Sequence, residues 1–225
     1  MAENNRTDEQ IANDVRDTLA WDIRIDDSNV GISVSDGVVT LSGTVGTFSE
    51  KVVASEDAWK IKGVKKVIDN LAVRPIGLRT DSDIVADIIN ALKWDNRVDA
   101  KGIVVNVSGG VVELSGMAGS LSEKRAAEED AWFTAGVVEV VNNITVAPER
   151  VRPDAEIVQD VRAALARDVR ITDASRISVE SISGKVYLRG AVESAPERAA
   201  AEEDARFTAG VVDVVNELAV VPLAA

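Results

Sequence analysis

Acidic side chains are the most abundant groups in this sequence that could take part in chemistry. Paired carboxylates can act as general acid and base, or hold a hard cation such as Ca²⁺. The acidic runs are Asp26-Asp27, Glu128-Glu129-Asp130 and Glu202-Glu203-Asp204. We expect the last two runs on a solvated helix face, and the acids show no EF-hand-like spacing. These runs therefore predict a charged surface rather than a metal site.

The residue types that most enzymes use beside such acids are missing. The chain contains no histidine and no cysteine. Triads that depend on imidazole, thiolate nucleophiles and the usual imidazole or thiolate metal sites therefore cannot be built. We expect no catalytic residue, no bound metal and no cofactor.

Two glycine-containing turns suggest a phosphate-binding loop. Gly43 to Gly46 and Gly116 to Gly119 each precede a predicted helix, where backbone amides can hold an anion. However, the serine or threonine that caps each helix already uses those amides, and the lysine of a P-loop is missing. We interpret both segments as structural turns.

One cluster combines an aromatic ring with basic side chains. It consists of Trp59, Lys60, Lys62, Lys65 and Lys66. The cluster lies at a predicted helix end and strand start, where lysines also suit the helix dipole. It could grip a phosphate-bearing surface, or it could be an ordinary solvated face. The solvated face is favoured, because the two later repeats of the sequence do not keep these lysines.

The tryptophans occupy two equivalent places in the repeat: Trp21 and Trp94 end one predicted helix, and Trp59 and Trp132 lie late in a second. The third repeat has Arg167 and Arg206 there, so neither place is deep in a core, because an unpaired buried charge is very costly. The rings could pack between domains, could be exposed anchors for a partner or a bilayer interface, or could fold over their own domain. We predict that at least one of them contacts another repeat.

The elements that position these residues come from a unit written three times. The spacing is regular at 73 or 74 residues, as seen for Asp8, Asp81 and Asp154 and for Gly63, Gly136 and Gly210. This period is too long for one solenoid unit and long enough for a small domain. Such a domain buries only about 60% of its unfolded surface, so neighbouring domains should support one another. We place the domains at residues 1–77, 78–150 and 151–225.

Each repeat begins with the same three elements. In the first repeat an aspartate that can cap a helix precedes Ile11, Val15 and Leu19, whose spacing predicts one buried helical stripe. Two segments with alternating apolar residues follow and predict a hairpin around Asp36-Gly37. The third repeat has a longer connection, residues 181–184, so we expect its hairpin to differ at the tip.

Each repeat ends with a second helix and a third strand. Capping boxes mark the helix starts: Thr47-x-x-Glu50, Ser120-x-x-Glu123 and Ser194-x-x-Glu197. The three repeat glycines should stop these helices at the C′ position, and Pro75, Pro148 and Pro222 close the units. The order αββαβ predicts an α+β fold in which each domain is a three-stranded mixed sheet with two helices on one face.

This pattern resembles the BON domain (bacterial OsmY and nodulation). The matching segments are Gly37 to Gly43 and Gly63 to Val73 with Asn70, then Gly110 to Gly116 and Gly136 to Asn142, then Gly184 to Gly190 and Gly210 to Asn216. The resemblance implies a bacterial, non-catalytic protein of the envelope or the osmotic-stress response. It also implies two binding modes, since several relatives are thought to attach to phospholipid surfaces and one cytosolic relative binds potassium.

Charge and hydropathy limit the partners and the compartment. The formal net charge is −13, which opposes binding to nucleic acid and to anionic membranes. No run approaches the roughly 20 apolar residues of a membrane span. Residues 1–7 are polar and show no secretory signal, so we expect a cytoplasmic protein. The oligomeric state is left open.

The expected function is therefore non-enzymatic binding or scaffolding in a bacterial osmotic or general stress response. The partner would be a protein, an envelope or a phospholipid surface. The alternative is a cytosolic protein that binds or senses a small cation such as potassium. The candidate interaction surface consists of Trp21, Trp59, Lys60, Lys62, Lys65, Lys66, Trp94 and Trp132.

Overall fold

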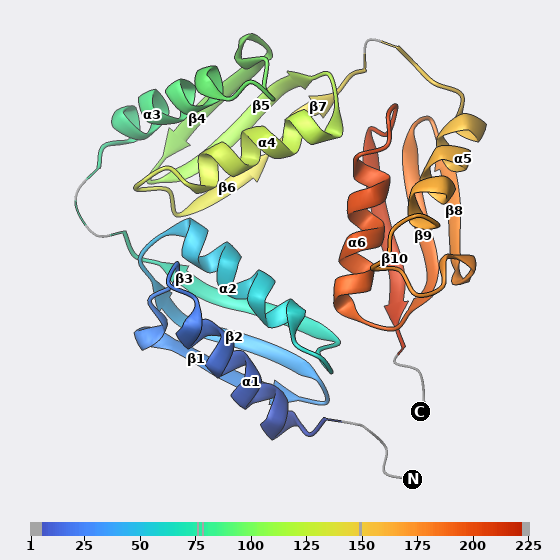
Figure 1. The fold of residues 1–225 in the computed structure, drawn as a ribbon. Coiled ribbons are helices and arrows are strands. Elements are labelled where there is room, and N and C mark those ends of the chain that lie inside the picture. Colours follow the sequence, from blue (N-terminus) through green and yellow to red (C-terminus); the bar gives the residue numbers. More distant parts are fainter. Residues whose placement is uncertain (1–5, 76, 78, 149, 222–225) are drawn as a thin grey trace.

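The computed structural model describes residues 6–75, 77, 79–148 and 150–221 of the 225-residue chain. Three repeats follow one another, each with the order helix, two strands, helix and strand. Figure 1 shows them as three units at the corners of a triangle, coloured blue to cyan, green to yellow, and orange to red. The fold is α+β, as the sequence predicts.

The first repeat contains α1 (Asp8–Trp21), β1 (Val30–Ser35), β2 (Val38–Val45), α2 (Phe48–Lys60) and β3 (Lys66–Val73). The second contains α3 (Asp81–Trp94), β4 (Ile103–Ser108), β5 (Val111–Ala118), α4 (Leu121–Trp132), β6 (Glu139–Asn142) and β7 (Thr145–Val146). The third contains α5 (Asp154–Leu165), β8 (Ile177–Ile182), β9 (Lys185–Val192), α6 (Ala195–Arg206) and β10 (Asp213–Val220). A short 3₁₀ turn precedes the first strand of each repeat, at Asp27–Asn29, Ala100–Gly102 and Ala174–Arg176.

Each sheet is mixed, and its second strand is the central one. In the first repeat β2 pairs antiparallel with β1 and parallel with β3, and the other repeats pair in the same way. The parallel partners have one register throughout: Leu41 with Asp69, Leu114 with Asn142 and Leu188 with Asn216. Asp69, and not Asn70, is therefore equivalent to the two later asparagines. In the second repeat the third strand keeps this register but is interrupted at Asn143 and Ile144, so it forms β6 and β7.

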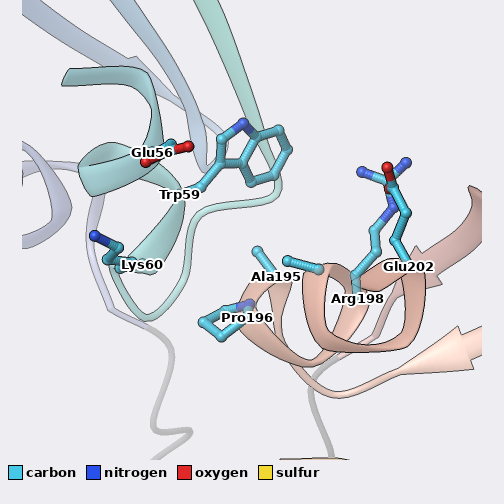
Figure 2. A pocket seen from close by; sticks show the side chains of 8 residues that line it. Glu56, Trp59, Lys60, Ala195, Pro196, Arg198 and Glu202 are labelled. Carbon is cyan, nitrogen blue, oxygen red and sulfur yellow. The ribbon is translucent and has the colours of Figure 1, made fainter. Parts of the chain in front are cut away.

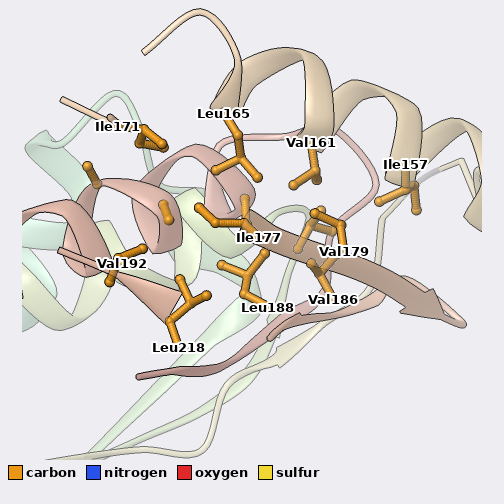
Figure 3. Close-up of a cluster of buried hydrophobic side chains, with 14 residues drawn as sticks. Ile157, Val161, Leu165, Ile171, Ile177, Val179, Val186, Leu188, Val192 and Leu218 are labelled. Carbon is orange, nitrogen blue, oxygen red and sulfur yellow. The ribbon is translucent and has the colours of Figure 1, made fainter. Parts of the chain in front are cut away.

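Every repeat has its own core between two helices and one face of its sheet. Ile11, Val15 and Leu19 are buried on α1, and the equivalent stripes of α3 and α5 are buried as well. Figure 3 shows the third repeat, in which the α5 side chains lie over strands β8 and β9. The second helix contributes alanines to each core, Ala58 among them. These small side chains allow the helix to lie close to the sheet.

The aspartate at the start of each first helix does not cap it, contrary to expectation. In the first repeat the cap is Thr7, whose hydroxyl accepts a hydrogen bond from the Gln10 amide at 3.2 Å. Asp8 is the first helical residue, and its carboxylate accepts hydrogen bonds from the amides of Asp36 and Gly37 at 2.8 and 2.9 Å. The equivalent aspartates of the other repeats bond their own hairpins in the same way. This residue therefore ties the first helix to the hairpin.

The hairpin of the third repeat does not differ at its tip, so that prediction was wrong. Its turn is Ser183-Gly184, with φ of 53° and 78°, and the turn Asp36-Gly37 has φ of 52° and 77°. Both are two-residue turns of the kind that requires positive φ at both positions. The longer connection predicted from the sequence is absorbed by β8, which extends to Ile182.

The capping box at the start of each second helix is only half formed. Thr47 Oγ1 accepts a hydrogen bond from the Glu50 amide at 3.1 Å. The Glu50 carboxylate, however, bonds the amides of Gly46 and Asp26, at 3.3 and 3.5 Å, instead of the Thr47 amide. The glutamates of α4 and α6 make the equivalent two contacts. This side chain therefore fastens the loop after the first helix to the start of the second.

The glycine that follows each second helix has positive φ, as predicted, but it is not the C′ residue. Helix α4 ends at Trp132, and Gly136 lies in a separate turn closed by a hydrogen bond from the Val137 amide to the Thr134 carbonyl. A Cβ atom at Gly136 would lie 2.9 Å from Cδ1 of Ile84. Conformation and space both require glycine there. The closing prolines Pro75 and Pro148 follow strands, whereas Pro222 lies outside the described residues.

The second helices of the three repeats line the inner edges of the triangle in Figure 1. The N-terminal end of α2 meets the C-terminal end of α4, that of α4 meets α6, and that of α6 meets α2. The three contacts are therefore related by a pseudo-threefold rotation and close on themselves. The repeats therefore touch one another, as expected for small domains that need support from their neighbours.

Candidate functional site

The repeats meet at three junctions that follow one plan. The first residue of each second helix is Phe48, Leu121 or Ala195, and the residue opposite lies late in the second helix of another repeat. We name the contacts junction 1/2 (Phe48 with Trp132), junction 2/3 (Leu121 with Arg206) and junction 3/1 (Ala195 with Trp59). Since the plan is shared, the residue types at these positions account for the differences among the junctions.

Junction 1/2 is closed by two aromatic rings. The ring centroids of Phe48 and Trp132 are 6.5 Å apart with a tilt of 51°, a favourable geometry for an aromatic pair. The Arg125 guanidinium covers Trp132 at 4.4 Å from the ring centroid. Phe48 also packs against the core of the second repeat. The prediction that at least one tryptophan contacts another repeat is confirmed by Trp132.

Junction 2/3 is closed by an aliphatic side chain beside an ion pair. Leu121 packs against the core of the third repeat. Arg206 lies half-buried opposite it and pairs with Glu202 of its own helix. A hollow of only about 120 Å³ is left, lined by Arg125, Asp213 and their neighbours. The arginine that replaces tryptophan in this repeat is thus at the margin of the domain and has a carboxylate partner.

Junction 3/1 is not filled. Ala195 stands where the other junctions have Phe48 and Leu121, and a hollow of about 390 Å³ lies between α2 and α6. Figure 2 shows the Trp59 ring on one side of it and Ala195, Pro196 and Arg198 on the other. Trp59 also packs against the core of its own repeat, which holds the ring in place. This junction therefore offers an aromatic wall to a ligand from outside the chain.

A second hollow of about 430 Å³ shares Lys60, Ala195 and Pro196 with the first. Its lining includes Arg6, Lys60, Lys62 and Lys65, against a single carboxylate, Glu193. Lys60 Nζ also lies 2.7 Å from an Asp57 oxygen. The second hollow gives junction 3/1 a basic part, although the whole chain is strongly acidic. The first hollow combines Trp59, Pro196 and two alanines with four charged residues, Glu56, Lys60, Arg198 and Glu202.

The structure divides the candidate surface predicted from the sequence. It brings Trp59 together with three of the lysines at junction 3/1, while Lys66 lies apart, exposed at the first position of β3. Trp132 is in junction 1/2. Trp21 and Trp94 lie at the ends of α1 and α3 and are 85% and 88% exposed. Trp21 and Lys60 line a further open hollow, so Trp21 adjoins the residues of junction 3/1, whereas Trp94 and Trp132 lie elsewhere. The eight residues therefore do not form one surface.

The exposed helix ends carry further apolar groups. Ile23, two residues beyond Trp21, is fully exposed, and Phe133 after α4 is 72% exposed. In the third repeat the equivalent ends expose Val169 and Phe207. Each repeat therefore presents bulky apolar side chains to water beyond its helix ends.

The acidic runs are not wholly solvated, which corrects the expectation for Asp130 and Asp204. Both are half-buried, and each has an oxygen without a hydrogen-bond partner among the described residues. Burial, and then the nearby Asp95, raise the pKa of Asp130, and the pKa of Asp204 is raised by burial and then by Asp168. A hydrogen bond from Arg97 lowers the pKa of Asp95. The equivalent residue of the first repeat, Asp57, is buried and pairs with Lys60.

The groups exposed at the junctions are suited to binding. Within the described ranges, no group of three or more acidic residues could hold a metal ion. No helix there is both long enough and apolar enough to cross a membrane. The junctions combine rings, methyl groups and fixed charges, which recognise apolar and anionic groups.

The sequence analysis missed the first residue of each second helix as a contact between repeats. Phe48, Leu121 and Ala195 follow the caps Thr47, Ser120 and Ser194 directly. The signal was present, because a phenylalanine and a leucine at a first helical position lie outside the alanine stripe. A bulky apolar side chain at such a place, in a chain of several small domains, indicates a contact between domains.

Comparison with known proteins agrees with this architecture. A family model of the BON domain matches residues 7–75, 80–148 and 153–222. The chain is 29% identical over 143 residues to osmotically-inducible protein Y of Escherichia coli (strain K12), covering 61% of this chain and 71% of the relative. It is 28% identical over 130 residues to an Anaplasma centrale protein named for the gshII 5′ region, covering 56% of this chain and 86% of that protein.

Among solved structures, CdsD, a structural protein of the type III secretion system of Chlamydia trachomatis, aligns over 94% of this chain and 92% of its own. The identity is 15% and the TM-score 0.27, and a likeness that low carries no inference about function. The family matches, in contrast, cover nearly the whole chain in register with the three αββαβ units. The chain therefore belongs to the BON domain family and carries three copies of the domain in tandem.

Proposed function

We propose that this protein is a non-catalytic binding protein of a bacterial osmotic-stress response that attaches to phospholipid surfaces. The name of its relative, osmotically-inducible protein Y, supports the physiological part of the proposal. The observation that carries the binding part is the exposure of two tryptophans at equivalent helix ends, Trp21 at 85% and Trp94 at 88%.

Large indole rings held in water favour an interface. Tryptophan is enriched where one side of a ring is apolar and the other wet, as at the headgroup level of a bilayer. Ile23 adds a fully exposed aliphatic group near Trp21, and Phe133 adds an exposed ring after α4. Burying each such side chain contributes roughly 1.5 to 3 kcal/mol. Two repeats bound together hold better than one, because the second contact is intramolecular.

Charge predicts which lipids are preferred. A net charge of −13 repels anionic headgroups, so the contact should depend on insertion of rings and not on charge attraction. We therefore expect binding to zwitterionic vesicles that changes little with salt. Phospholipid is present on both sides of a bacterial membrane, so the proposal does not depend on the compartment.

Vesicle co-sedimentation tests this proposal. The full chain is mixed with phosphatidylcholine and phosphatidylethanolamine vesicles and pelleted. We expect the double variant Trp21→Ala with Trp94→Ala to reduce the pelleted fraction severalfold. Arg167→Ala, at the equivalent position of the third repeat, is the matched control and should pellet like the wild type. Failure of the wild type to pellet, or unchanged pelleting of the double variant, would refute the proposal.

The domain limits are part of the proposal as well. We keep the boundaries at residues 1–77, 78–150 and 151–225. Gly77 and Arg150 are exposed between the elements of successive repeats. Limited proteolysis should cut first near these two residues and leave three resistant fragments. No observation in the described part of the chain favours the alternative of cation binding.

A further inference from the structure

Junction 3/1 departs from the plan that fills the other two junctions. Phe48 and Leu121 each place a bulky apolar side chain against the neighbouring repeat, where they pack on its core. Ala195 at the third equivalent position has a single methyl group, and Pro196 follows it. The wall that would receive a larger side chain is nevertheless present, because Trp59 lies opposite. A hollow of about 390 Å³ lies beside this contact, although α2 and α6 approach each other more closely than the helices of the other two junctions do.

The pseudo-threefold relation indicates what would fill the place. In junction 1/2 the equivalent volume is taken by one aromatic side chain at 6.5 Å from a tryptophan ring, and in junction 2/3 by one leucine. Phe48 and Leu121 each lie in a polypeptide segment that faces the C-terminal end of the second helix of another repeat. A phenylalanine or leucine side chain from another polypeptide would therefore find a tryptophan ring to pack on at junction 3/1, with space to spare.

The surrounding charge indicates the neighbours of that side chain. Lys60, Lys62 and Lys65 line the adjoining hollow together with Arg6, and Glu193 is the carboxylate among its lining residues. Arg6 pairs with Asp14 and Lys60 with Asp57, so the positive charge of this place on a chain of net charge −13 comes from Lys62 and Lys65, which have no ion-pair partner among the described residues. Glu56 and Glu202 line the first hollow. A segment with carboxylates beside its apolar residue would meet attraction here and repulsion over much of the remaining surface.

We propose that junction 3/1 is a binding site for a short acidic peptide segment of a partner protein. One bulky apolar side chain of the segment packs against Trp59 beside Ala195, and flanking carboxylates lie on Lys62 and Lys65. Trp94 lies in another repeat, and Trp21 borders a neighbouring hollow with Lys60 without lining the proposed site itself. The peptide and vesicle measurements therefore test different residues.

The probe is a fluorescein-labelled peptide with the sequence Gly-Asp-Asp-Phe-Asp-Glu-Gly, titrated with the full chain and followed by fluorescence anisotropy. A second peptide, with alanine in place of phenylalanine, reports the part of the affinity that is due to the ring. We expect the phenylalanine peptide to bind at least about tenfold more tightly. In two-dimensional NMR the Trp59 indole signal should shift on binding, and the Trp21 and Trp94 signals should not.

Two variants of the chain test the two parts of the site. Ala195→Phe introduces at the hollow the side chain that Phe48 supplies in junction 1/2. With the fold checked by the thermal midpoint, peptide affinity should fall at least about tenfold. Lys62→Glu with Lys65→Glu should lower the affinity by a similar factor and reduce its dependence on salt. Lys93→Glu with Lys101→Glu, which changes two exposed lysines of the second repeat, should have little effect.

Three outcomes would overturn the proposal. The first is no binding of the phenylalanine peptide at millimolar protein concentration, or equal binding of the alanine peptide. The second is unchanged peptide binding by Ala195→Phe. The third is loss of vesicle pelleting by Ala195→Phe with no peptide binding by the wild type, which would assign the hollow to lipid.

Discussion

Junction 1/2 and junction 3/1 have the same backbone plan and opposite outcomes. In the first, Phe48 at the start of α2 closes on Trp132 at the end of α4. In the second, Ala195 at the start of α6 faces Trp59 at the end of α2 across a hollow of about 390 Å³. The exchange of phenylalanine for alanine thus replaces a contact between two rings by a closer approach of the two helices with a hollow beside it. The repeat provides the scaffold, and the residue after each N-cap decides whether the junction is closed.

The residues around the two tryptophans differ as well. Trp132 is covered on one side by Arg125 and meets Phe48 of another repeat. Trp59 has its own core behind it and a basic hollow nearby. The third repeat, which lacks both tryptophans, contributes the small residues of junction 3/1.

The largest expected effect is the loss of stability when the glycine after the second helix is replaced. It tests whether the repeats have the same backbone structure there. Gly136→Val and Gly63→Val should each destabilise their repeat by about 3 kcal/mol, because valine disfavours positive φ and its Cβ would meet the first helix. Hydrogen exchange of core amides measures the loss repeat by repeat. Gly109→Ala is the control, since its Cβ would meet nothing within 4 Å, and it should lose about 1 kcal/mol.

A loss confined to Gly136→Val would show that the turns after α2 and α4 are not equivalent. Junction 1/2 and junction 3/1 could then not be compared as equivalent positions of one repeated structure. An unchanged stability in both variants would show that neither glycine has the left-handed conformation described above.

The second prediction compares the two tryptophans directly. Trp132→Ala should cost about 2 kcal/mol, because it removes an aromatic pair and a half-buried ring. Trp59→Ala should cost about 1 kcal/mol, since one side of its ring borders a hollow. Urea unfolding of the full chain, analysed without assuming a two-state transition, measures both. Equal losses would mean that junction 3/1 is as well packed as junction 1/2.

Most of the fold could be predicted from the sequence, because short-range sequence patterns indicate its helices, strands and turns. The stripe of Ile11, Val15 and Leu19 and the turn Asp36-Gly37 each have a short-range cause, and three copies confirm one another. The errors arose where a side chain had a more distant partner. Asp8 looked like a cap, yet its carboxylate holds the hairpin tip. Glu50 looked like half of a local box, yet it also reaches the loop at Asp26.

The candidate site was predictable only in its parts. Trp59 and the lysines stood out by composition, but nothing local indicates that Pro196 lies opposite them. The proximity of Trp59 and Pro196 depends on how the three domains are arranged around one another. The sequence pattern within one repeat does not predict that arrangement. The exposed Trp21 and the packed Trp132 could not be told apart for the same reason.

The third prediction concerns a variant that gives junction 3/1 the phenylalanine found in junction 1/2. Ala195→Phe should stabilise the chain by about 1 kcal/mol, because it buries a ring in an existing hollow. This gain corresponds to a rise of about 3 °C in the thermal midpoint for a chain of this size. Leu121→Phe is the matched control at junction 2/3, where little space remains, and it should bring no gain. A loss of stability in Ala195→Phe, with the control unchanged, would mean that the helices cannot admit the ring.

The smallest expected effect concerns the buried aspartates behind the two tryptophans. Asp57 pairs with Lys60, whereas Phe133 stands at the position of that lysine behind Asp130. Burial and Asp95 raise the pKa of Asp130, so ionising it costs more in the folded chain than in the unfolded one. For a raised pKa the stabilising contribution is complete below the unfolded value of about 3.9 and is lost as the pH rises through the folded pKa.

Asp130→Asn removes that loss, so it should stabilise the second repeat at pH 7 by less than about 1 kcal/mol and have no such advantage below about pH 3. Asp57→Asn should instead destabilise the first repeat at pH 7 by a few tenths of a kcal/mol, since it breaks a partly exposed ion pair with Lys60. Hydrogen exchange at pH 7, with urea unfolding from pH 3 to pH 7, measures both signs. The changes in stability at pH 7 should have opposite signs in the two variants. This difference would show that the equivalent aspartates have different electrostatic surroundings. If both variants lose stability at pH 7, a partner other than Lys60 neutralises Asp130, and the two helix ends are electrostatically alike.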